Sequence, residues 1–239
     1  MNTIKIRKKQ CKLIAHRGLS GLEKENTIAS FIAAGNRSYY GCECDIHKTK
    51  DGIYVICHDD NLDRVSGEDI NIQEYDAKYL QSILLKSNFD DEKKSYYFVP
   101  TLKEYIEICK KYDKYCIIEF KGDFPKSDVL EVIDEIKSLD YLDKVIFISF
   151  YPNPLIYTRK ALPSQEIEFL MFEYRDEIYE LCKKYQFGLD SRFDLINEDI
   201  IGKWHSLGLK VNAWTVNDKL EAKRLIDLGI DYITTNILE

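Results

Sequence analysis

The sequence predicts an α/β fold in which eight parallel strands close into a (β/α)8 TIM barrel. Short strand-like runs alternate with helical patterns along most of the 239 residues, which is typical of a parallel sheet. The helical patterns before the last two strands end at Gly208 and Gly229, a common way for a helix to end. An open doubly wound sheet is the alternative, but the GxGxxG motif is absent from the chain.

The expected strands are short runs rich in β-branched, aromatic and other apolar residues. They cover residues 11–16, 42–47, 53–58, 116–121, 144–150, 166–172, 187–190, 210–216 and 231–236. Asp51-Gly52 is a strong turn signal between the second and third runs, so we expect these two to pair as a hairpin. Counted together, they occupy one position in the barrel, which leaves eight positions.

The expected helices show apolar residues at the three- and four-residue spacing of an amphipathic helix. They cover residues 26–36, 100–112, 127–139, 154–162, 175–185, 197–208 and 217–229. We expect Asn26 to cap the first of them, and Pro100 to stand at the start of the second. Residues 59–99 are polar and rich in tyrosine, and they break the alternation. We therefore expect one barrel domain over residues 1–239, with an insertion at about 59–99 over one barrel mouth.

The composition disfavours several classes of protein. A net charge of −7 argues against a nucleic-acid partner for the whole protein. The basic N-terminus is not followed by an apolar segment, and no apolar run is long enough to cross a membrane, so we expect neither a signal peptide nor a membrane span. The seven cysteines are odd in number and form no CxxC pair, which favours free thiols in a cytoplasmic protein.

The stretch GCECDIHKTKDGIYVICHDD places several polar groups on an expected strand. Glu43, Asp45 and His47 share one face, because a strand presents every second residue to the same side. Cys42 and Cys44 point the other way, toward the helix layer, where we expect them to pack in the core rather than bind a soft metal. The polar row is either an exposed face of the sheet or a functional site.

Other strands end in similar groups, at the end where barrels of this class carry their chemistry. His16 closes the first strand, His58 ends the hairpin and Glu119 lies near the end of the next strand. With Glu43 and Asp45, Glu119 offers oxygen ligands that suit Mg²⁺ or Ca²⁺. The two histidines can transfer protons near neutral pH.

The remaining cations and histidines of these segments have simpler expected roles. Arg17 and Lys121 stand beside the acidic and histidine groups, where they can hold an anion, most naturally a phosphate. His47 lies one step farther along its strand, near the turn, so we expect it at the rim of the barrel rather than among the ligands. His205, on an expected helix, is interpreted as structural.

Taken together, these residues resemble the glycerophosphodiester phosphodiesterase family. The resemblance is an ordered set of motifs along nearly the whole chain: IAHRG (14–18), ENT…SF…A (25–33), ECD (43–45), T-K-DG (49–52), V-x-x-HD (55–59) with L-x-R (62–64), PTL (100–102), IEFK (118–121), ISF (148–150), NAWTV (212–216) and DYITTN (231–236). It implies a TIM barrel with a small insertion between the second and third strands. It also implies metal-dependent hydrolysis of glycerophosphodiesters to sn-glycerol 3-phosphate and an alcohol.

The resemblance assigns roles to individual residues. The family's ligands for a divalent cation, which would be Mg²⁺ or Ca²⁺ with Mn²⁺ as a third candidate, match Glu43, Asp45 and Glu119. Its acid/base pair, whose two roles stay open here, matches His16 and His58. Its phosphate-binding and pocket-wall residues match Arg17, Lys121 and Trp214.

The chain departs from the family pattern at two positions. Lys24 stands where the family commonly has proline, and Asn236 where it usually has aspartate. We expect both to affect the pocket mouth and neither to contact the metal and proton-transfer groups.

Two other functions stay open. A lysophospholipase D would need an apolar groove, for which the aromatic segment 89–98 is the candidate, and a non-catalytic phosphodiester-binding barrel is disfavoured by the intact acids and histidines.

Overall fold

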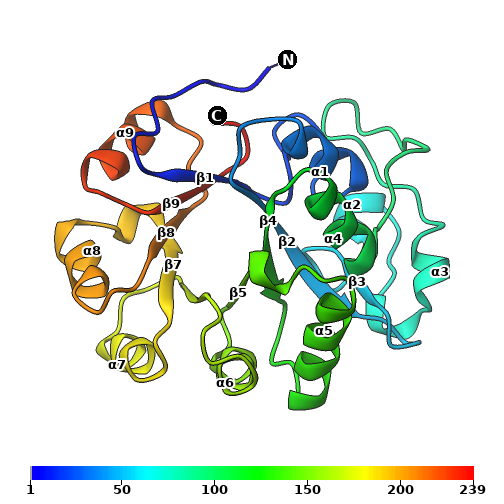
Figure 1. Ribbon diagram of the computed structural model, residues 1–239. Helices are drawn as coiled ribbons and strands as arrows, with labels where there is room; N and C mark the ends of the chain where they lie inside the picture. The colour runs from blue at the N-terminus through cyan, green and yellow to red at the C-terminus, as the bar shows by residue number, and fades with distance from the viewer. Residues whose placement is uncertain (1) are drawn as a thin grey trace.

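The computed structural model describes residues 2–239 and confirms the (β/α)8 TIM barrel (Figure 1). The barrel strands pair in parallel, and β1 pairs with both β9 and β2, so the ring closes. In order around the ring, the strands are β1 (Lys12–Ala15), β9 (Tyr232–Thr235), β8 (Val211–Trp214), β7 (Gly188–Arg192), β6 (Ile167–Met171), β5 (Val145–Ser149), β4 (Tyr115–Phe120) and β2 (Gly41–Lys48).

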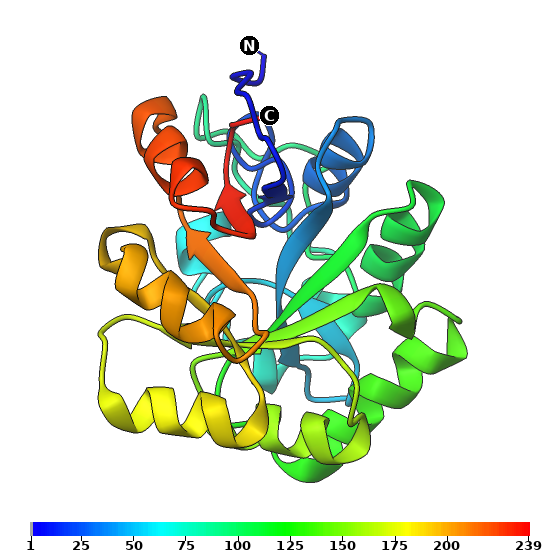
Figure 2. The ribbon, with the colours of Figure 1, turned by 60° about the vertical axis from the view of Figure 1, so that its left-hand side comes forward.

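Helices surround the strands, as Figures 1 and 2 show from two sides. They are α1 (Ile28–Gly35), α4 (Leu102–Lys111), α5 (Lys126–Ser138), α6 (Pro152–Ala161), α7 (Asp176–Tyr185), α8 (Glu198–His205) and α9 (Lys219–Asp227). Their buried faces pack against the outward-facing side chains of the strands, and this layer is the main apolar core. Cys42 and Cys44 lie in it, as expected, and all seven cysteines are free and buried.

A smaller apolar layer fills the inside of the ring. It consists of Ile14, Ile117, Ile146, Ile148, Leu170 and Tyr232. Because side chains alternate along each strand, the same strands present apolar groups to the helices and a second set of groups to the barrel axis. The inward set becomes polar toward the carboxyl ends of the strands, where the site lies. Within residues 2–239, no helix has both the length and the apolar character needed to cross a membrane.

The cap of α1 differs from the expectation. Thr27, rather than Asn26, is the N-cap, and it forms a capping box with Ser30 in which each side chain accepts from the other's backbone N–H. Asn26 has a left-handed φ of 55° and donates from Nδ2 to Asp45 Oδ2 at 2.7 Å. The prediction failed because the side chain of Asn26 is directed into the barrel, where a buried carboxylate accepts its hydrogen bond.

Strand β3 (Tyr54–Ile56) lies outside the ring and pairs antiparallel with the last residues of β2, which confirms the hairpin. Gly52 adopts the left-handed φ of 83° that the turn requires. After β3, the backbone N–H of Cys57 donates to the carbonyl of Asp45 at 3.0 Å. The hairpin therefore brings His58 back beside the carboxyl end of β2.

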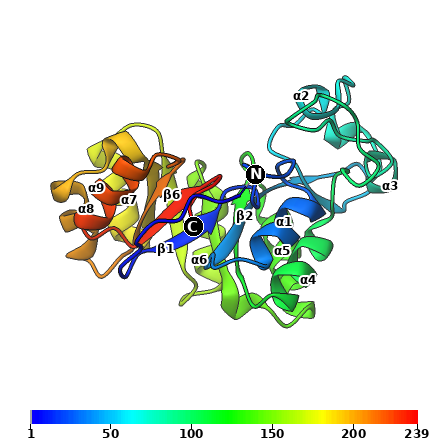
Figure 3. The ribbon, with the colours of Figure 1, turned by 90° about the horizontal axis from the view of Figure 1, so that it is seen from above.

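The segment 59–99 has short helical turns, which are α2 (Asp63–Ser66), η1 (Ile72–Glu74) and α3 (Ala77–Leu80). Figure 3 shows the part that carries α2 and α3 to one side of the ring of strands. Its apolar residues form a second cluster with residues that flank the segment, among them Val55 and Cys57. Further short turns, η2 (Leu142–Lys144) and η3 (Phe193–Leu195), connect barrel elements.

Candidate active site

A cavity of about 80 Å³, which we call the inner cavity, opens among the carboxyl ends of the barrel strands. Seven of the eight site residues expected from the sequence line it: His16, Arg17, Glu43, His58, Glu119, Lys121 and Trp214. Asp45, the eighth, is buried beside Glu43 and Glu119. A wider and more open space, which we call the outer cavity, adjoins the inner one and shares His58 and Lys121 with it.

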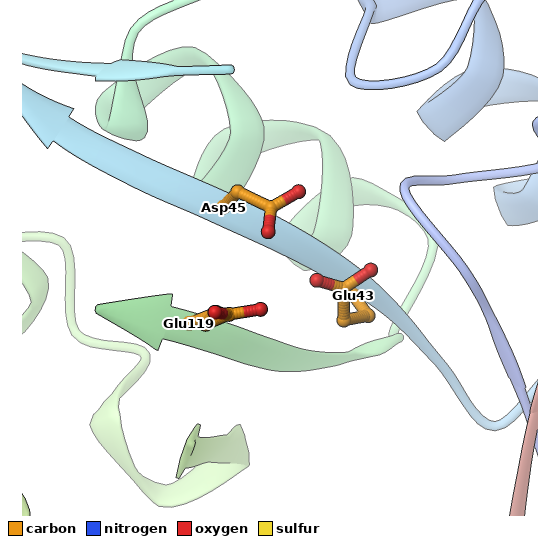
Figure 4. Close-up of side chains that lie close together, drawn as sticks. All are labelled: Glu43, Asp45 and Glu119. Atoms are coloured by element: carbon orange, nitrogen blue, oxygen red, sulfur yellow. The ribbon is translucent and has the colours of Figure 1, made fainter. Parts of the chain in front are cut away.

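Three carboxylates converge beside the inner cavity (Figure 4). Glu43 and Asp45 point inward from β2, and Glu119 points inward from β4, where it pairs in register with Asp45. One oxygen from each carboxylate lies within 4.8 Å of the others, and all three side chains are buried. Three oxygen donors at this spacing fit a hard divalent cation such as Mg²⁺ or Ca²⁺.

The electrostatics of this cluster also favour a cation. Burial and the charge of Asp45 raise the pKa of Glu43 and bring the pKa of Glu119 to about 8. Burial opposes the ionisation of Asp45 too, but Arg17 and Lys121 hold its pKa below the usual value. Asp45 Oδ1 accepts no hydrogen bond, and Lys121 Nζ lies 3.5 Å from it. The described residues thus leave the cluster short of positive charge, which a divalent cation would supply.

His16 follows β1, and each of its two ring nitrogens lies near a polar side chain. Its Nδ1 lies 2.8 Å from Asn236 Oδ1, and its Nε2 lies 4.0 Å from Glu43 Oε2. An amide oxygen only accepts, so Nδ1 carries the proton and Nε2 presents a lone pair beside the carboxylates. Burial and the neighbouring Arg17 lower the pKa of His16 to about 4, so the ring is neutral at pH 7.

The contact between His16 and Asn236 corrects an expectation. Asn236 was expected to lie outside the proton-transfer groups, yet its side chain fixes the tautomer of His16. Lys24, the other departure from the family pattern, is buried and donates from Nζ to Asn88 Oδ1 at 3.2 Å, away from the carboxylates. Asn236 could be singled out from the sequence because it belongs to the DYITTN motif. A motif does not show, however, which other side chain a residue contacts.

His58 stands where the inner and outer cavities meet. Its Nδ1 lies 2.7 Å from Asp59 Oδ1, which leaves Nε2 free. Burial, together with the charges of Arg17 and Lys121, holds the pKa of His58 below its usual value, although the charge of Asp45 and the hydrogen bond to Asp59 oppose this shift. Asp59 is held in turn by Arg64, whose Nε lies 2.5 Å from Asp59 Oδ2.

An ion-pair network joins the two histidine-bearing segments. Glu25 accepts from Arg64 at 2.7 Å and from Arg17 at 2.9 Å. Arg17 has a left-handed φ of 53°, and its backbone N–H donates to Glu43 Oε2 at 2.8 Å. Glu25 belongs to the ENT motif and Arg64 to the L-x-R motif, but the sequence did not indicate that the two residues bind each other.

Aromatic rings form one side of the site. Trp214, at the end of β8, meets Phe172 and Phe150 edge to face at centroid distances of 5.2 and 5.9 Å. Phe150 and Phe172 stack on each other at 4.2 Å and line both cavities. Trp214 and the two phenylalanines thus line one side of the inner cavity, and the role of Trp214 toward a substrate stays a prediction.

The two remaining histidines lie apart from the carboxylate cluster. His47 lines the outer cavity, as its place near the rim predicted, but it is buried, and its Nε2 lies 3.3 Å from the carbonyl oxygen of His58. It therefore contacts the site through backbone rather than standing free of it. His205 lies on α8, with Nε2 2.7 Å from Asp231 Oδ2, at the opposite end of the strands from the site.

Comparison with known proteins identifies the family. The model of the family described as "Glycerophosphoryl diester phosphodiesterase family" matches residues 16–239. This chain belongs to the glycerophosphoryl diester phosphodiesterase family. The glycerophosphodiester phosphodiesterase of Caldanaerobacter subterraneus subsp. tengcongensis is 30% identical to it over 235 residues, which cover 94% of this chain and 93% of the relative. The glycerophosphodiester phosphodiesterase of Bacillus subtilis is 27% identical, and the match covers 93% of this chain and 82% of that protein.

Solved structures of glycerophosphodiester phosphodiesterases share the fold. A phosphodiesterase from Oleispira antarctica, solved in complex with the product sn-glycerol-3-phosphate, has a TM-score of 0.85 and 26% identity, and the match covers 94% of this chain and 92% of that one. A glycerophosphodiester phosphodiesterase from Parabacteroides distasonis has a TM-score of 0.80 and 26% identity, with 96% and 94% covered. The family and enzyme class predicted from the motifs are therefore confirmed.

Proposed function

We propose that this chain hydrolyses glycerophosphodiesters to sn-glycerol 3-phosphate and an alcohol, with a divalent cation held by Glu43, Asp45 and Glu119. The meeting of three buried carboxylates with His16 and His58 carries the proposal. The names of the curated relatives and the product bound to the Oleispira antarctica phosphodiesterase support it. When bound, Mg²⁺, Ca²⁺ or Mn²⁺ would polarise a phosphoryl oxygen and lower the pKa of an attacking hydroxyl group.

We assign the role of base to His16. The contact with Asn236 keeps the proton on Nδ1, so Nε2 is free to accept one, and the low pKa keeps the ring neutral at pH 7. The glycerol 2-hydroxyl oxygen forms a bond to phosphorus as its proton passes to His16 Nε2. Direct attack by water is the alternative, and it would use the same proton acceptor.

We assign the role of acid to His58. Asp59 accepts the hydrogen bond from Nδ1 and so stabilises the protonated ring, as a carboxylate does for a catalytic histidine. The bond between phosphorus and the alcohol oxygen breaks, and that oxygen takes a proton from His58 Nε2. Water then opens the cyclic phosphate with the two histidines in exchanged roles, which restores both rings to their starting states.

Arg17 and Lys121 would bind the phosphoryl group. Arg17 Nε is buried and has no hydrogen-bond partner among the described residues, and Lys121 reaches from β4 to within 3.0 Å of Glu119 and 3.5 Å of Asp45. Both cations line the inner cavity, where charge on the phosphoryl oxygens grows during the reaction. Fixed cations in a water-poor site stabilise that charge more than water does.

The direct test measures release of sn-glycerol 3-phosphate from glycerophosphocholine. The purified protein is assayed as prepared, with EDTA, and with Mg²⁺, Ca²⁺ or Mn²⁺ added back. We expect activity that EDTA removes and a divalent cation restores. His16→Ala and His58→Ala should each lower kcat by about 10²–10⁴-fold, the usual contribution of general acid–base catalysis. Full kcat in both variants with metal present would refute the assignment.

Exposed aromatic groups at the mouth keep lysophospholipids as a second candidate substrate class. Phe172 is 57% exposed and Tyr151 is 45% exposed, and both line the outer cavity. Segment 89–98, the candidate for an apolar groove, contributes no lining residue to the inner or the outer cavity. Hydrolysis of lysophosphatidylcholine measured beside glycerophosphocholine decides between the classes. We expect glycerophosphocholine to be preferred, because the outer cavity also carries Asp60, Glu173 and Arg175.

A further inference from the structure

Asp190 faces the inner cavity from the side opposite the carboxylate cluster. Its strand, β7, is four strands from β2 in either direction around the ring. Asp190 is 2% exposed and lines the inner cavity together with Thr234 and Trp214 from β9 and β8. A substrate that reaches from the carboxylates across the cavity would meet this side chain.

One oxygen of Asp190 lacks a partner. Oδ1 is buried and accepts no hydrogen bond from any residue of the described chain. A buried polar group without a hydrogen bond is destabilising, and such groups are rare unless a ligand or water satisfies them. The apolar side chains that line the cavity near it, Ile148, Leu170 and Phe172, cannot donate to it.

The polar groups next to Asp190 form hydrogen bonds with one another. Thr234 Oγ1 donates to Asn212 Oδ1 at 3.2 Å, and Asn212 Nδ2 donates to Glu168 Oε2 at 3.3 Å. Glu168 lies deeper on β6, where burial and the nearby Asp190 raise its pKa. Two buried carboxyl groups, Glu168 and Asp190, therefore lie on this side of the barrel. Of the two, Asp190 lines the inner cavity.

We propose that Asp190 binds the terminal hydroxyl group of the glycerol moiety and so selects glycerol-containing phosphodiesters. The inference rests on the proposed function, in which the 2-hydroxyl and the phosphoryl group lie near the carboxylates and His16. The third carbon of glycerol would then extend away from that side, toward β7. A hydroxyl there would hydrogen-bond to the Asp190 carboxyl group, whereas a methyl group would leave that group unpaired.

A site built to bind a hydroxyl group discriminates against an analogue that lacks it, because the buried partner is then unsatisfied. The cost of leaving a buried polar group without its hydrogen bond supports about a 10–100-fold preference. The test substrates are glycerophosphocholine and the phosphocholine diester of propane-1,2-diol joined through its primary oxygen. The second keeps the 2-hydroxyl and has hydrogen in place of the terminal hydroxyl. We expect the wild-type protein to favour the first by about 10–100-fold in kcat/KM.

Three variants test whether the preference for the terminal hydroxyl group depends on Asp190. Asp190→Ala should lower kcat/KM for glycerophosphocholine, mainly through KM, and leave the propanediol substrate little changed, so that the preference collapses. Asp190→Asn keeps an oxygen acceptor and should retain most of the preference. Thr234→Val removes the other cavity-lining hydroxyl on this side and should retain it too. A preference that survives in Asp190→Ala, or collapses in Thr234→Val instead, overturns the proposal.

Binding provides a readout without turnover. Calorimetry with sn-glycerol 3-phosphate and with propane-1,2-diol 1-phosphate should show the same preference in the wild-type protein and its loss in Asp190→Ala. Equal binding of the two phosphates by the wild-type protein contradicts the proposal. Failure of the proposed function is distinguishable, because the wild-type protein would then cleave neither diester even with metal added.

Discussion

Asp59 Oδ1 lies 2.7 Å from Nδ1 of His58, and this contact directs the other ring nitrogen into the cavity. Asp59→Ala removes the acceptor, so the ring is free to rotate or change tautomer. We expect kcat to fall by about 10–100-fold with a smaller change in KM, since the contact acts on proton transfer rather than on substrate binding. Steady-state kinetics on glycerophosphocholine measure both. Asp59→Asn keeps an oxygen acceptor and should recover part of the loss; equal kcat in the wild type and Asp59→Ala contradicts the assignment.

Asn236 provides the matching contact for His16. Asn236→Ala should lower kcat by about tenfold, because Nδ1 then lacks the acceptor that keeps its proton in place. Asn153→Ala, an exposed residue of α6 that contacts Asp123, is the control and should leave kcat unchanged. If both variants match the wild type at saturating substrate, the tautomer of His16 is fixed by something other than Asn236.

Removal of the cation should also lower stability. The three buried carboxylates repel one another, and a cation that binds the folded chain alone raises the free energy of unfolding by about 2.7 kcal/mol at 100 times its Kd. Thermal unfolding with EDTA and with added Mg²⁺ or Ca²⁺ measures the effect. Glu119→Gln should reduce the metal-dependent shift in Tm, whereas Glu180→Gln, exposed on α7, should not. The same shift in both variants would place the cation elsewhere.

Glu25 should make stability depend on pH. Burial opposes its ionisation, but Arg64 and Arg17 hold its pKa at about 2, against about 4.3 in an unfolded chain. Because the folded pKa is the lower one, the contribution is complete above about pH 5 and is lost as the pH falls toward 2. Its size is on the order of 2–3 kcal/mol. Urea unfolding of Glu25→Gln and the wild type should differ most at pH 7, and the difference should shrink steadily as the pH falls toward 2. Glu107→Gln, exposed on α4, is the control, and a difference for Glu25→Gln that does not shrink in acid would refute the linkage.

The sequence predicted the barrel because each layer leaves a periodic pattern. Alternation along β2 separates Glu43 and Asp45 from Cys42 and Cys44, and the structure places the pairs on opposite faces of the strand. Helix starts were predicted less well, since Asn26 has the right chemistry for a cap but its side chain binds Asp45 instead. The sequence rule for helix caps fails here because a buried carboxylate binds the side chain that would otherwise cap the helix.

The sequence indicated the residues of the candidate site that are unusual polar groups at strand ends. The partners that orient those residues were not predictable in the same way, because they come from distant segments. Asn236 reaches His16 across 220 positions of sequence, and Arg64 reaches Glu25 across 39. Asp190 lies in a short, weak strand pattern. That its side chain lines the inner cavity is known only once the strands are seen to close into a ring.

The hairpin that delivers His58 is anchored in both apolar clusters. Cys57 and Val55 belong to the apolar cluster of segment 59–99, whereas Tyr54 and Ile56 belong to the core between strands and helices. The position of His58 thus depends in part on the small cluster, while the strands that carry His16 and the acids pack in the large one. On heating, the small cluster has less buried surface to lose. Inactivation should therefore begin below the temperature at which circular dichroism reports barrel unfolding, and recover on cooling.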